Sequence, residues 1–352
     1  MSNEKTPAAR TKLDSRRVID LLLNNALIII MLVVAAYVAV TQPNFLSPRS
    51  LVNLLTLTAA YLPVALGIAG CIVLTGTDLS AGRAVGITAC ISASLLQSAD
   101  AANKMWTSIG TLPIPLVILI VVGIGACIGA FNGFFVARFK LHPFIVTLAT
   151  QLILYTCLLL YVQAGNNNGM AISSLDDGYR NFVVGNPPLL TFNDGAIQIP
   201  NFVIYAILLT ALMWFIWNKT TFGKNMFALG ANEEAARVSG VNVFLTTILV
   251  FALAGAMYGF TGFVEGARIG SNTANTGFNY EQDAIAACVI GGVSFVGGIG
   301  KIRGIVVGVF LLRLIFVGLT MISIDQNLQY LIKGAIILFA CAVDMRKYLA
   351  KK

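Results

Sequence analysis

Apolar segments of about 20 residues recur along the whole chain, and each is long enough to cross the roughly 30 Å hydrocarbon core of a bilayer. Of all residues, 57% are hydrophobic and only 11% are charged, whereas a soluble domain carries roughly 25% charged residues. The pattern predicts an all-α polytopic membrane protein with about ten transmembrane helices, in a single domain over residues 21–345. The ten predicted spans are residues 21–41, 52–74, 84–98, 113–137, 143–163, 201–217, 243–264, 284–299, 303–322 and 328–344.

The basic residues orient these spans. With ten spans both termini lie on one side, and that side would hold seventeen lysines and arginines, Arg83 included, against four on the other: Arg49, Lys104, Arg180 and Arg268. Positive charge marks the cytoplasmic side, so the tails at residues 1–20 and 346–352 are predicted to be cytoplasmic. Arg313 and Lys333 remain within spans. Topology accounts for the net charge of +8, which therefore gives no reason to expect a nucleic acid partner.

Signs of catalysis are missing from the sequence. It contains no G-x-x-x-x-G-K-[ST] phosphate loop, and its one histidine, His142, precedes a proline in a predicted turn. The six cysteines fall in apolar segments without C-x-x-C spacing and are expected to be small core residues. We therefore predict no catalytic residues, no bound metal and no cofactor on this chain.

The cytoplasmic loop at residues 218–242 contains a short helix with capping signals at both ends. Asn232 is a good N-cap, Glu233 and Glu234 suit the positive end of a helix dipole, and Arg237 is spaced to pair with Glu233. A helix of about two turns is unstable alone in water, so it must be held against something. A partner protein is one interpretation, and an amphipathic linker on the lipid headgroups is the other. The expected contact residues are Asn232, Glu233, Glu234, Ala235, Ala236, Arg237, Ser239 and Gly240.

Four polar residues are candidates for a substrate path: Asp78, Asn132, Glu281 and Asp283. Glu281 and Asp283 end a predicted external loop at residues 266–283, which leads into the eighth span. A charge near the bilayer centre is costly, so Asp78 belongs either to a cytoplasmic turn or to a broken segment that lines a polar cavity. Hydrogen bonding between helices would explain each of the four equally well.

Two predicted spans, the third and the eighth, are short and flanked by glycine. Short, interrupted segments at matching places in two halves indicate the binding region of a transporter, which would make spans 2–5 and 7–10 two repeats. Glycines also recur four residues apart at 125, 129 and 133, at 255 and 259, and at 300, 304 and 308. This spacing indicates close helix packing, inside the subunit or at a dimer interface. The external loop at residues 164–200 either docks a partner or is flexible.

Four separated motifs carry a resemblance that covers the chain from about Phe45 onward. They are Gly76–Gly82 (GTDLSAG), Pro143–Thr150 (PFIVTLAT), Gly223–Val241 (GKNMFALGANEEAARVSGV) and Asp283–Gly298 (DAIAACVIGGVSFVGG). With these motifs in this order the chain resembles the permease subunits of bacterial monosaccharide ABC importers of the ribose/xylose/galactose type. Within that family, the likeness is greatest to the galactose/methyl galactoside branch.

The resemblance implies a function and a set of partners. Two copies of such a subunit surround a path through the bacterial inner membrane. A separate ATPase with two nucleotide-binding halves holds the ATP and Mg²⁺, and a periplasmic protein delivers galactose, methyl galactoside or glucose. The loop helix at Asn232–Gly240 would be the coupling helix that docks on the ATPase. Two other classes remain open: a sugar transporter driven by an ion gradient, and a membrane-embedded enzyme.

Overall fold

The computed structural model describes residues 26–187, 191–192 and 197–349. Each predicted span contains a helix, so the all-α prediction is confirmed. The predicted tail at residues 1–20 and the end of the basic tail lie outside the described residues. The helices of the spans are α2 (Ala26–Thr41), α3 (Pro48–Val73), α4 (Ala81–Leu95), α5 (Ile114–Phe139), α6 (Pro143–Gln163), α8 (Asn201–Lys219), α11 (Val243–Ile269), α12 (Tyr280–Ile290), α13 (Ile302–Met321) and α14 (Gln326–Leu349).

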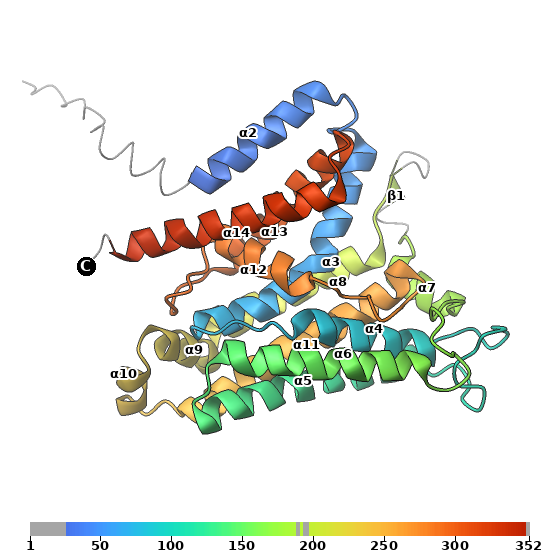
Figure 1. The fold of residues 1–352 in the computed structure, drawn as a ribbon, viewed down its shortest axis with the longest axis horizontal. Coiled ribbons are helices and arrows are strands. Elements are labelled where there is room, and N and C mark those ends of the chain that lie inside the picture. The colour runs from blue at the N-terminus through green and yellow to red at the C-terminus, as the bar shows by residue number, and fades with distance from the viewer. Residues whose placement is uncertain (1–25, 188–190, 193–196, 350–352) are drawn as a thin grey trace, which may run out of the picture.

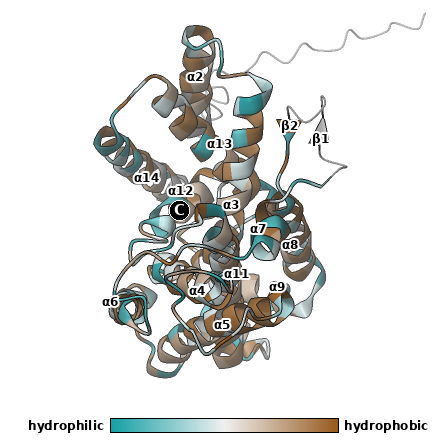
Figure 2. Ribbon diagram, turned by 90° about the vertical axis from the view of Figure 1, so that its right-hand side faces the viewer, coloured by the Kyte–Doolittle hydropathy of each residue, from teal (hydrophilic) through white to brown (hydrophobic). Residues whose placement is uncertain are grey.

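Seven of these helices are long and apolar enough to cross a membrane: α3, α5, α6, α8, α11, α13 and α14. The apolar helix α4 has 15 residues and α12 has 11, so neither crosses a bilayer unaided. Apolar side chains such as Leu119, Leu152 and Leu208 are more than 60% exposed on the outer helices. Figure 2 shows the same apolar character over most of the ribbon, as expected for a lipid-facing surface.

The helices form two layers joined by α3 (Figure 1). One layer holds α4, α5, α6 and α11, and the other holds α2, α13 and α14. The helix α3 runs from one layer to the other, and most of its residues are buried. The cytoplasmic loop folds into α9 (Thr221–Ala231) and α10 (Glu233–Val238) at one end of the molecule, where α14 also ends. This arrangement agrees with a cytoplasmic C-terminus.

The opposite end carries the predicted external loop. Part of that loop forms α7 (Asp177–Val184) and a two-stranded antiparallel hairpin, β1 (Thr191–Phe192) and β2 (Ile197–Gln198). Tyr179 of α7 is fully buried and donates a hydrogen bond from its hydroxyl to the Phe263 carbonyl oxygen at 2.6 Å. The described part of the loop is therefore packed against α11 through α7.

Two helical repeats of opposite direction make up most of the fold. In the first half α3 is followed by α4, α5 and α6, and in the second half α11 is followed by α12, α13 and α14. Each long first helix packs against the short helix and the next helix of the other half: α11 against α4 and α5, and α3 against α12 and α13. This exchanged pattern supports the predicted repeats at spans 2–5 and 7–10.

Glycines allow these helices to approach closely. A Cβ at Gly129 would lie 1.9 Å from the Phe251 carbonyl oxygen, and a Cβ at Gly255 would lie 2.0 Å from that of Gly125. The same holds between α12 and α13, where a Cβ at Gly308 would lie 2.0 Å from the Ala287 carbonyl oxygen. Five of the glycines flagged in the sequence thus hold α5 against α11, and others hold α13 against α12. The structure accounts for them by packing within the subunit.

Two predictions need correction here. The eighth span was predicted at residues 284–299, but its helix ends at Ile290 and a glycine-rich loop follows, with Gly292 at φ +80°. Hydropathy continues through that loop, whereas the backbone does not remain helical. The cysteines were expected in the core, but Cys127 and Cys157 are exposed on the apolar surface.

Candidate functional site

The loop helix α10 has the caps that its sequence predicts. The Asn232 side chain accepts a hydrogen bond from Ala235 N–H at 2.9 Å. Arg237 contacts Glu233 at 2.6 Å and Glu234 at 3.4 Å. The Ser239 N–H caps the end by donating to the Ala235 carbonyl oxygen, and Gly240 turns the chain at φ +86°. These contacts satisfy the helix ends, so the short helix keeps its shape on the surface.

Almost the whole of α10 is open to a partner. Ala236 is buried, at 3% exposure, while Val238 is 88% exposed and every other residue from 231 to 240 is exposed. An exposed valine beside paired charges is a surface with both apolar and polar groups, as a protein interface requires.

The helix is joined to the membrane region through α9. At the end of α9 a Cβ on Gly230 would lie 1.8 Å from the Val73 carbonyl oxygen, so α9 touches the end of α3 backbone to backbone. Gly298 N–H donates to the same Val73 oxygen at 2.9 Å. Displacement of α10 would therefore push on both the α3–α4 break and the loop that follows α12.

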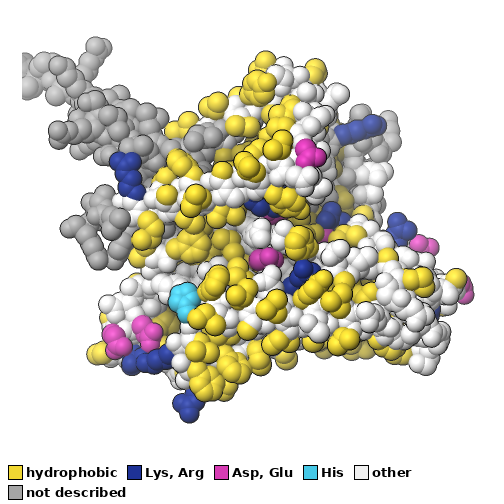
Figure 3. Space-filling view, in the orientation of Figure 1, with side chains coloured by type: hydrophobic (Ala, Val, Ile, Leu, Met, Phe, Trp, Pro, Cys, Tyr) yellow, Lys and Arg dark blue, Asp and Glu magenta, His cyan; other side chains and the backbone are white. Residues whose placement is uncertain are grey.

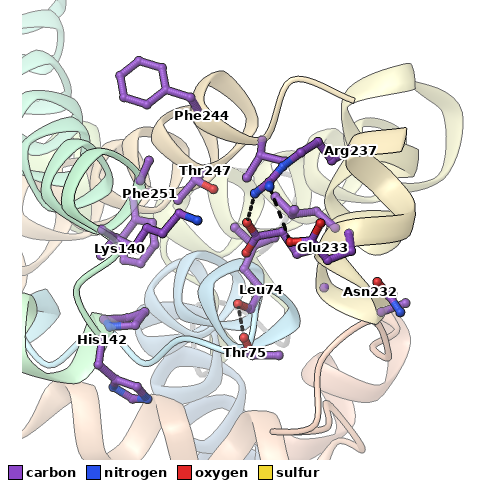
Figure 4. Close-up of a pocket in the computed structure, with 18 of the residues that line it drawn as sticks. Leu74, Thr75, Lys140, His142, Asn232, Glu233, Arg237, Phe244, Thr247 and Phe251 are labelled. Atoms are coloured by element: carbon purple, nitrogen blue, oxygen red, sulfur yellow. Dashed lines mark hydrogen bonds and ion pairs between the residues drawn. The ribbon is translucent and has the colours of Figure 1, made fainter. Parts of the chain in front are cut away.

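A cavity of about 880 Å³ lies beside α10 on the cytoplasmic side. Figure 4 shows Glu233 and Arg237 on one wall, with Lys140 and His142 on the other side of the cavity. His142 is the N-cap of α6, and its Nδ1 accepts from Phe144 N–H at 3.3 Å. This contact supports the turn interpretation of His142.

The chain between α3 and α4 turns back into the molecule instead of forming a surface turn. Asp78 has no exposed surface, and its Oδ1 accepts from Ser80 N–H at 2.9 Å and from the Ser80 hydroxyl at 2.6 Å. Asp78 therefore does not lie in an exposed turn but in a buried, non-helical segment. It does not line the cavity described above, so a role in a polar cavity stays a prediction.

Asp78 and Asn132 belong to one hydrogen-bond network. The Asn132 amide donates to Ser80 Oγ at 2.9 Å, and the Thr150 hydroxyl donates to Asn132 Oδ1 at 2.6 Å. The network joins the start of α4 to α5 and α6. Hydrogen bonding between helices thus explains Asn132.

The N-termini of α4 and α12 meet deep inside the protein. A Cβ at Gly82 would lie 2.1 Å from Glu281 Oε2 and 2.5 Å from the Gly277 carbonyl oxygen. Both helix dipoles present their positive ends there, which favours carboxylates in this place. Asp78, Glu281 and Asp283 all lie within the first turn of α4 or α12 or just before it.

Arg83 also lies at this junction, and its predicted cytoplasmic placement is wrong. It is 8% exposed, it donates from Nη1 to the Ala274 carbonyl oxygen at 3.0 Å, and it lies over the Tyr155 ring at 4.4 Å. Because the chain re-enters before α4, the first turn of this helix lies inside the molecule. Figure 3 shows acidic and basic side chains near the middle of one face, surrounded by apolar ones.

Asp283 is separate from the Asp78 network and is paired with two cations. Arg313 Nη2 lies 2.6 Å from Asp283 Oδ2, and the Lys333 ammonium is bound to Oδ1. Asp78 and Asn132 therefore lie in one cluster, Asp283 lies in another, and Glu281 lies at the junction of α4 and α12.

Sequence reasoning missed several of these partners. Arg313 and Lys333 were noted only as charges within spans, and Glu265 was overlooked. Glu265 is fully buried, is bound by Arg268 at 2.7 Å and accepts from the Tyr280 hydroxyl at 2.9 Å. The i,i+3 spacing of Glu265 and Arg268 was a usable signal, because residues three apart are neighbours on a helix.

Comparison with known proteins supplies the family. The family described as "Branched-chain amino acid transport system / permease component" matches residues 50–341. The chain is 46% identical to the galactose/methyl galactoside import permease protein MglC of Escherichia coli K12, over 97% of this chain and 99% of the relative. It is 44% identical to the protein of that name in Haemophilus influenzae Rd, with the same coverage.

A more distant relative is the ribose import permease protein RbsC of E. coli K12, which is 31% identical over 91% of this chain and 93% of the relative. No solved structure matches the chain significantly. With matches that extend over almost its full length, the chain belongs to this family of transport-system permease components, as a membrane-spanning transporter subunit.

Proposed function

We propose that this chain is the transmembrane subunit of an ABC importer that moves galactose or methyl galactoside across the bacterial inner membrane. The names of the relatives with 44–46% identity over almost the whole chain support this substrate class. The observation that carries the mechanism is the exposed, capped helix α10, which contacts the membrane breaks through α9.

The proposed partners follow from that mechanism. An ATPase with two nucleotide-binding halves binds ATP and Mg²⁺ and receives α10 from each of two permease copies. A periplasmic sugar-binding protein docks at the end that carries α7. When the ATPase halves close, α10 and α9 move together and shift the end of α3 and the loop after α12.

Sugar passage is proposed along the junction of α4 and α12, near Glu281 and Asp283. Asp78 and Asn132 lie behind it and hold α4, α5 and α6 together by hydrogen bonds. They would fix the position of the first half-helix and need not contact the sugar.

An ion-driven transporter is the competing function. It requires a membrane carboxylate that is able to bind H⁺ or Na⁺. Asp283 instead binds Arg313 and Lys333, and Asp78 Oδ1 accepts two bonds from Ser80. These contacts occupy Asp283 and one oxygen of Asp78, whereas Asp78 Oδ2 has no hydrogen-bond partner among the described residues. The preference for the ATP-driven function therefore rests on the names of the relatives.

Uptake by proteoliposomes tests the proposal. The chain is reconstituted with or without its ATPase and binding protein, and labelled galactose is counted inside the vesicles. We expect uptake only when both partners and ATP are present. Uptake by the chain alone under a proton gradient would contradict the proposal and favour the ion-driven function.

A further inference from the structure

A second cavity, of about 270 Å³, lies among α12, α13, α14 and Tyr61 of α3. It is lined by the first two turns of α14, at Gln326, Gln329, Tyr330 and Lys333, and therefore lies toward the external end of that helix. Its volume equals that of roughly nine liquid waters, which is enough for one monosaccharide ring.

Charged and aromatic side chains line this cavity together. Asp283 holds Arg313 and Lys333, and all three side chains are about nine-tenths buried. The Arg313 guanidinium lies 3.4 Å from the centre of the Tyr61 ring, and Lys333 lies 5.1 Å from that of Tyr330. Among the described residues, Arg313 Nε has no hydrogen-bond partner, although an unpaired buried donor is costly. A ligand with several hydroxyl groups would supply acceptors here.

The charged side chains buried inside the protein balance one another in number. The charged groups buried or half-buried at membrane depth among the described residues are four acids and four bases, which sum to zero. They are Asp78, Glu265, Glu281, Asp283, Arg83, Arg268, Arg313 and Lys333. The cavity itself is lined by one acid, Asp283, and two bases, Arg313 and Lys333. The choice of a neutral ligand therefore rests on the import function proposed above and not on this balance.

The corresponding place in the other half of the fold is filled. There, α4, α5 and α6 are joined by the short bonds among Asp78, Ser80, Asn132 and Thr150, and the first three of these residues have no exposed surface. The repeat as such therefore does not require a cavity. The second half has charged and aromatic side chains where the first half has small polar side chains that hydrogen-bond one another.

We propose that this cavity is the external sugar site of the permease. Asp283, Arg313, Lys333 and the neighbouring side-chain amides bind the hydroxyls of a neutral hexose, and the exposed ring of Tyr330 packs against its C–H face. Pockets for small ligands commonly combine a few placed polar groups with aromatic walls. The assignment rests on the sugar-import function and names where the permease itself holds the sugar after the binding protein releases it.

The first test separates sugar handling from ATP hydrolysis. In the complete complex, Lys333→Met removes one hydroxyl-binding cation and leaves Asp283 paired with Arg313. We expect sugar moved per ATP hydrolysed to fall about tenfold, the effect of losing one charged hydrogen bond. ATP hydrolysis and subunit co-purification should stay within twofold of wild type. The control Lys219→Met changes an exposed lysine at the cytoplasmic end and should leave the ratio unchanged.

Two outcomes of this test would overturn the site. One is an unchanged ratio in Lys333→Met. The other is a parallel loss of assembly, hydrolysis and uptake, which would make the ion cluster a purely structural connection. ATP-independent uptake by the wild-type complex would instead refute the import function on which the site depends.

The second test measures directly whether a sugar occupies the cavity. Tyr330→Cys is placed in a background without the exposed Cys127 and Cys157, within the complete complex. A membrane-impermeant thiol reagent is then applied from the external side. We expect millimolar galactose to slow labelling at least threefold and galacturonate to have no effect. Protection by galacturonate alone would replace the neutral-sugar site with an anion site, and protection by neither sugar would reject it.

Discussion

Asp78 shows how one acidic side chain is kept out of lipid. Its Oδ1 accepts two bonds from Ser80, and Ser80 in turn accepts from Asn132, so two residues of the segment before α4 are tied to α5. Among the described residues, Asp78 Oδ2 has no hydrogen-bond partner. The sequence identified Asp78 and Asn132 as unusual because polar groups are costly at this depth. It could not show that they meet, because 54 residues separate them and no periodicity relates them.

Replacing Asp78 with leucine separates insertion from transport. Insertion should be at least as good as wild type because a charge at membrane depth is removed. Uptake should fall about tenfold, since the Ser80 N–H loses its acceptor and the start of α4 loses its position. Membrane yield and vesicle uptake are measured together. Asp78→Asn keeps an acceptor and should retain most activity, and wild-type uptake by the leucine variant would show the network to be dispensable.

Asp283, Arg313 and Lys333 are likewise kept out of lipid, because they pair with one another. Arg313 and Lys333 were visible in the sequence as charges within apolar spans, which predicts burial against a partner. Asp283 was instead expected at the end of an external loop. The partners are 30 and 50 residues away on two other helices. Only the packing of α12, α13 and α14 shows which charges pair.

At the scale of elements, glycine controls how closely helices approach. Apolar length predicted α3, α5, α6, α11 and α13 well, because a span of that length has few alternatives in a bilayer. The end of α12 was not predicted, because Gly291 and Gly292 stop the helix inside an apolar run. Glycine spacing predicted close packing, and the structure shows that the packed pairs are α5 with α11 and α12 with α13.

Gly129 and Gly123 form a matched pair for testing this packing. A Cβ at Gly129 would meet the Phe251 carbonyl oxygen at 1.9 Å, whereas nothing lies within 4 Å of one at Gly123. We expect Gly129→Ala to destabilise the protein by about 1–3 kcal/mol, as overpacking does, and Gly123→Ala to be neutral or slightly stabilising. Thermal unfolding in detergent measures both. Equal midpoint temperatures of unfolding for the two variants would show that α5 and α11 separate without cost to make room for the added methyl group.

A charge reversal on α10 tests the role of this helix without changing the membrane region. Arg237→Glu reverses one charge on an exposed surface and breaks ion pairs that are worth about 0.3–0.5 kcal/mol each. The variant should therefore insert and fold normally but bind the ATPase at least tenfold more weakly. Co-purification and uptake are compared with Lys219→Glu, a charge reversal outside α10. Normal ATPase binding by Arg237→Glu would remove α10 from the interface.

At the scale of the whole molecule, the two inverted halves bring the ends of α4 and α12 together. A continuous connection runs from α10 through α9 to the end of α3 and the loop after α12. A movement of α10 can thus be transmitted toward the junction of α4 and α12 through backbone contacts and not through flexible side chains. The short spans and glycine motifs predicted where the membrane pattern breaks, but not that the two breaks face each other.

The zero sum of the charges at membrane depth has an electrical consequence. Moving one elementary charge through a potential of 100 mV changes its energy by about 2.3 kcal/mol, which is how voltage sensors work. If all eight groups are ionised and move as one unit, they carry no net charge through the field, and a neutral sugar adds none. Import at fixed ATP should therefore run at the same rate whether a potassium diffusion potential makes the vesicle interior negative or positive. A rate that follows the potential would mean that charge crosses the membrane during the cycle, and a cell with a collapsed membrane potential would then lose the uptake that we expect it to keep.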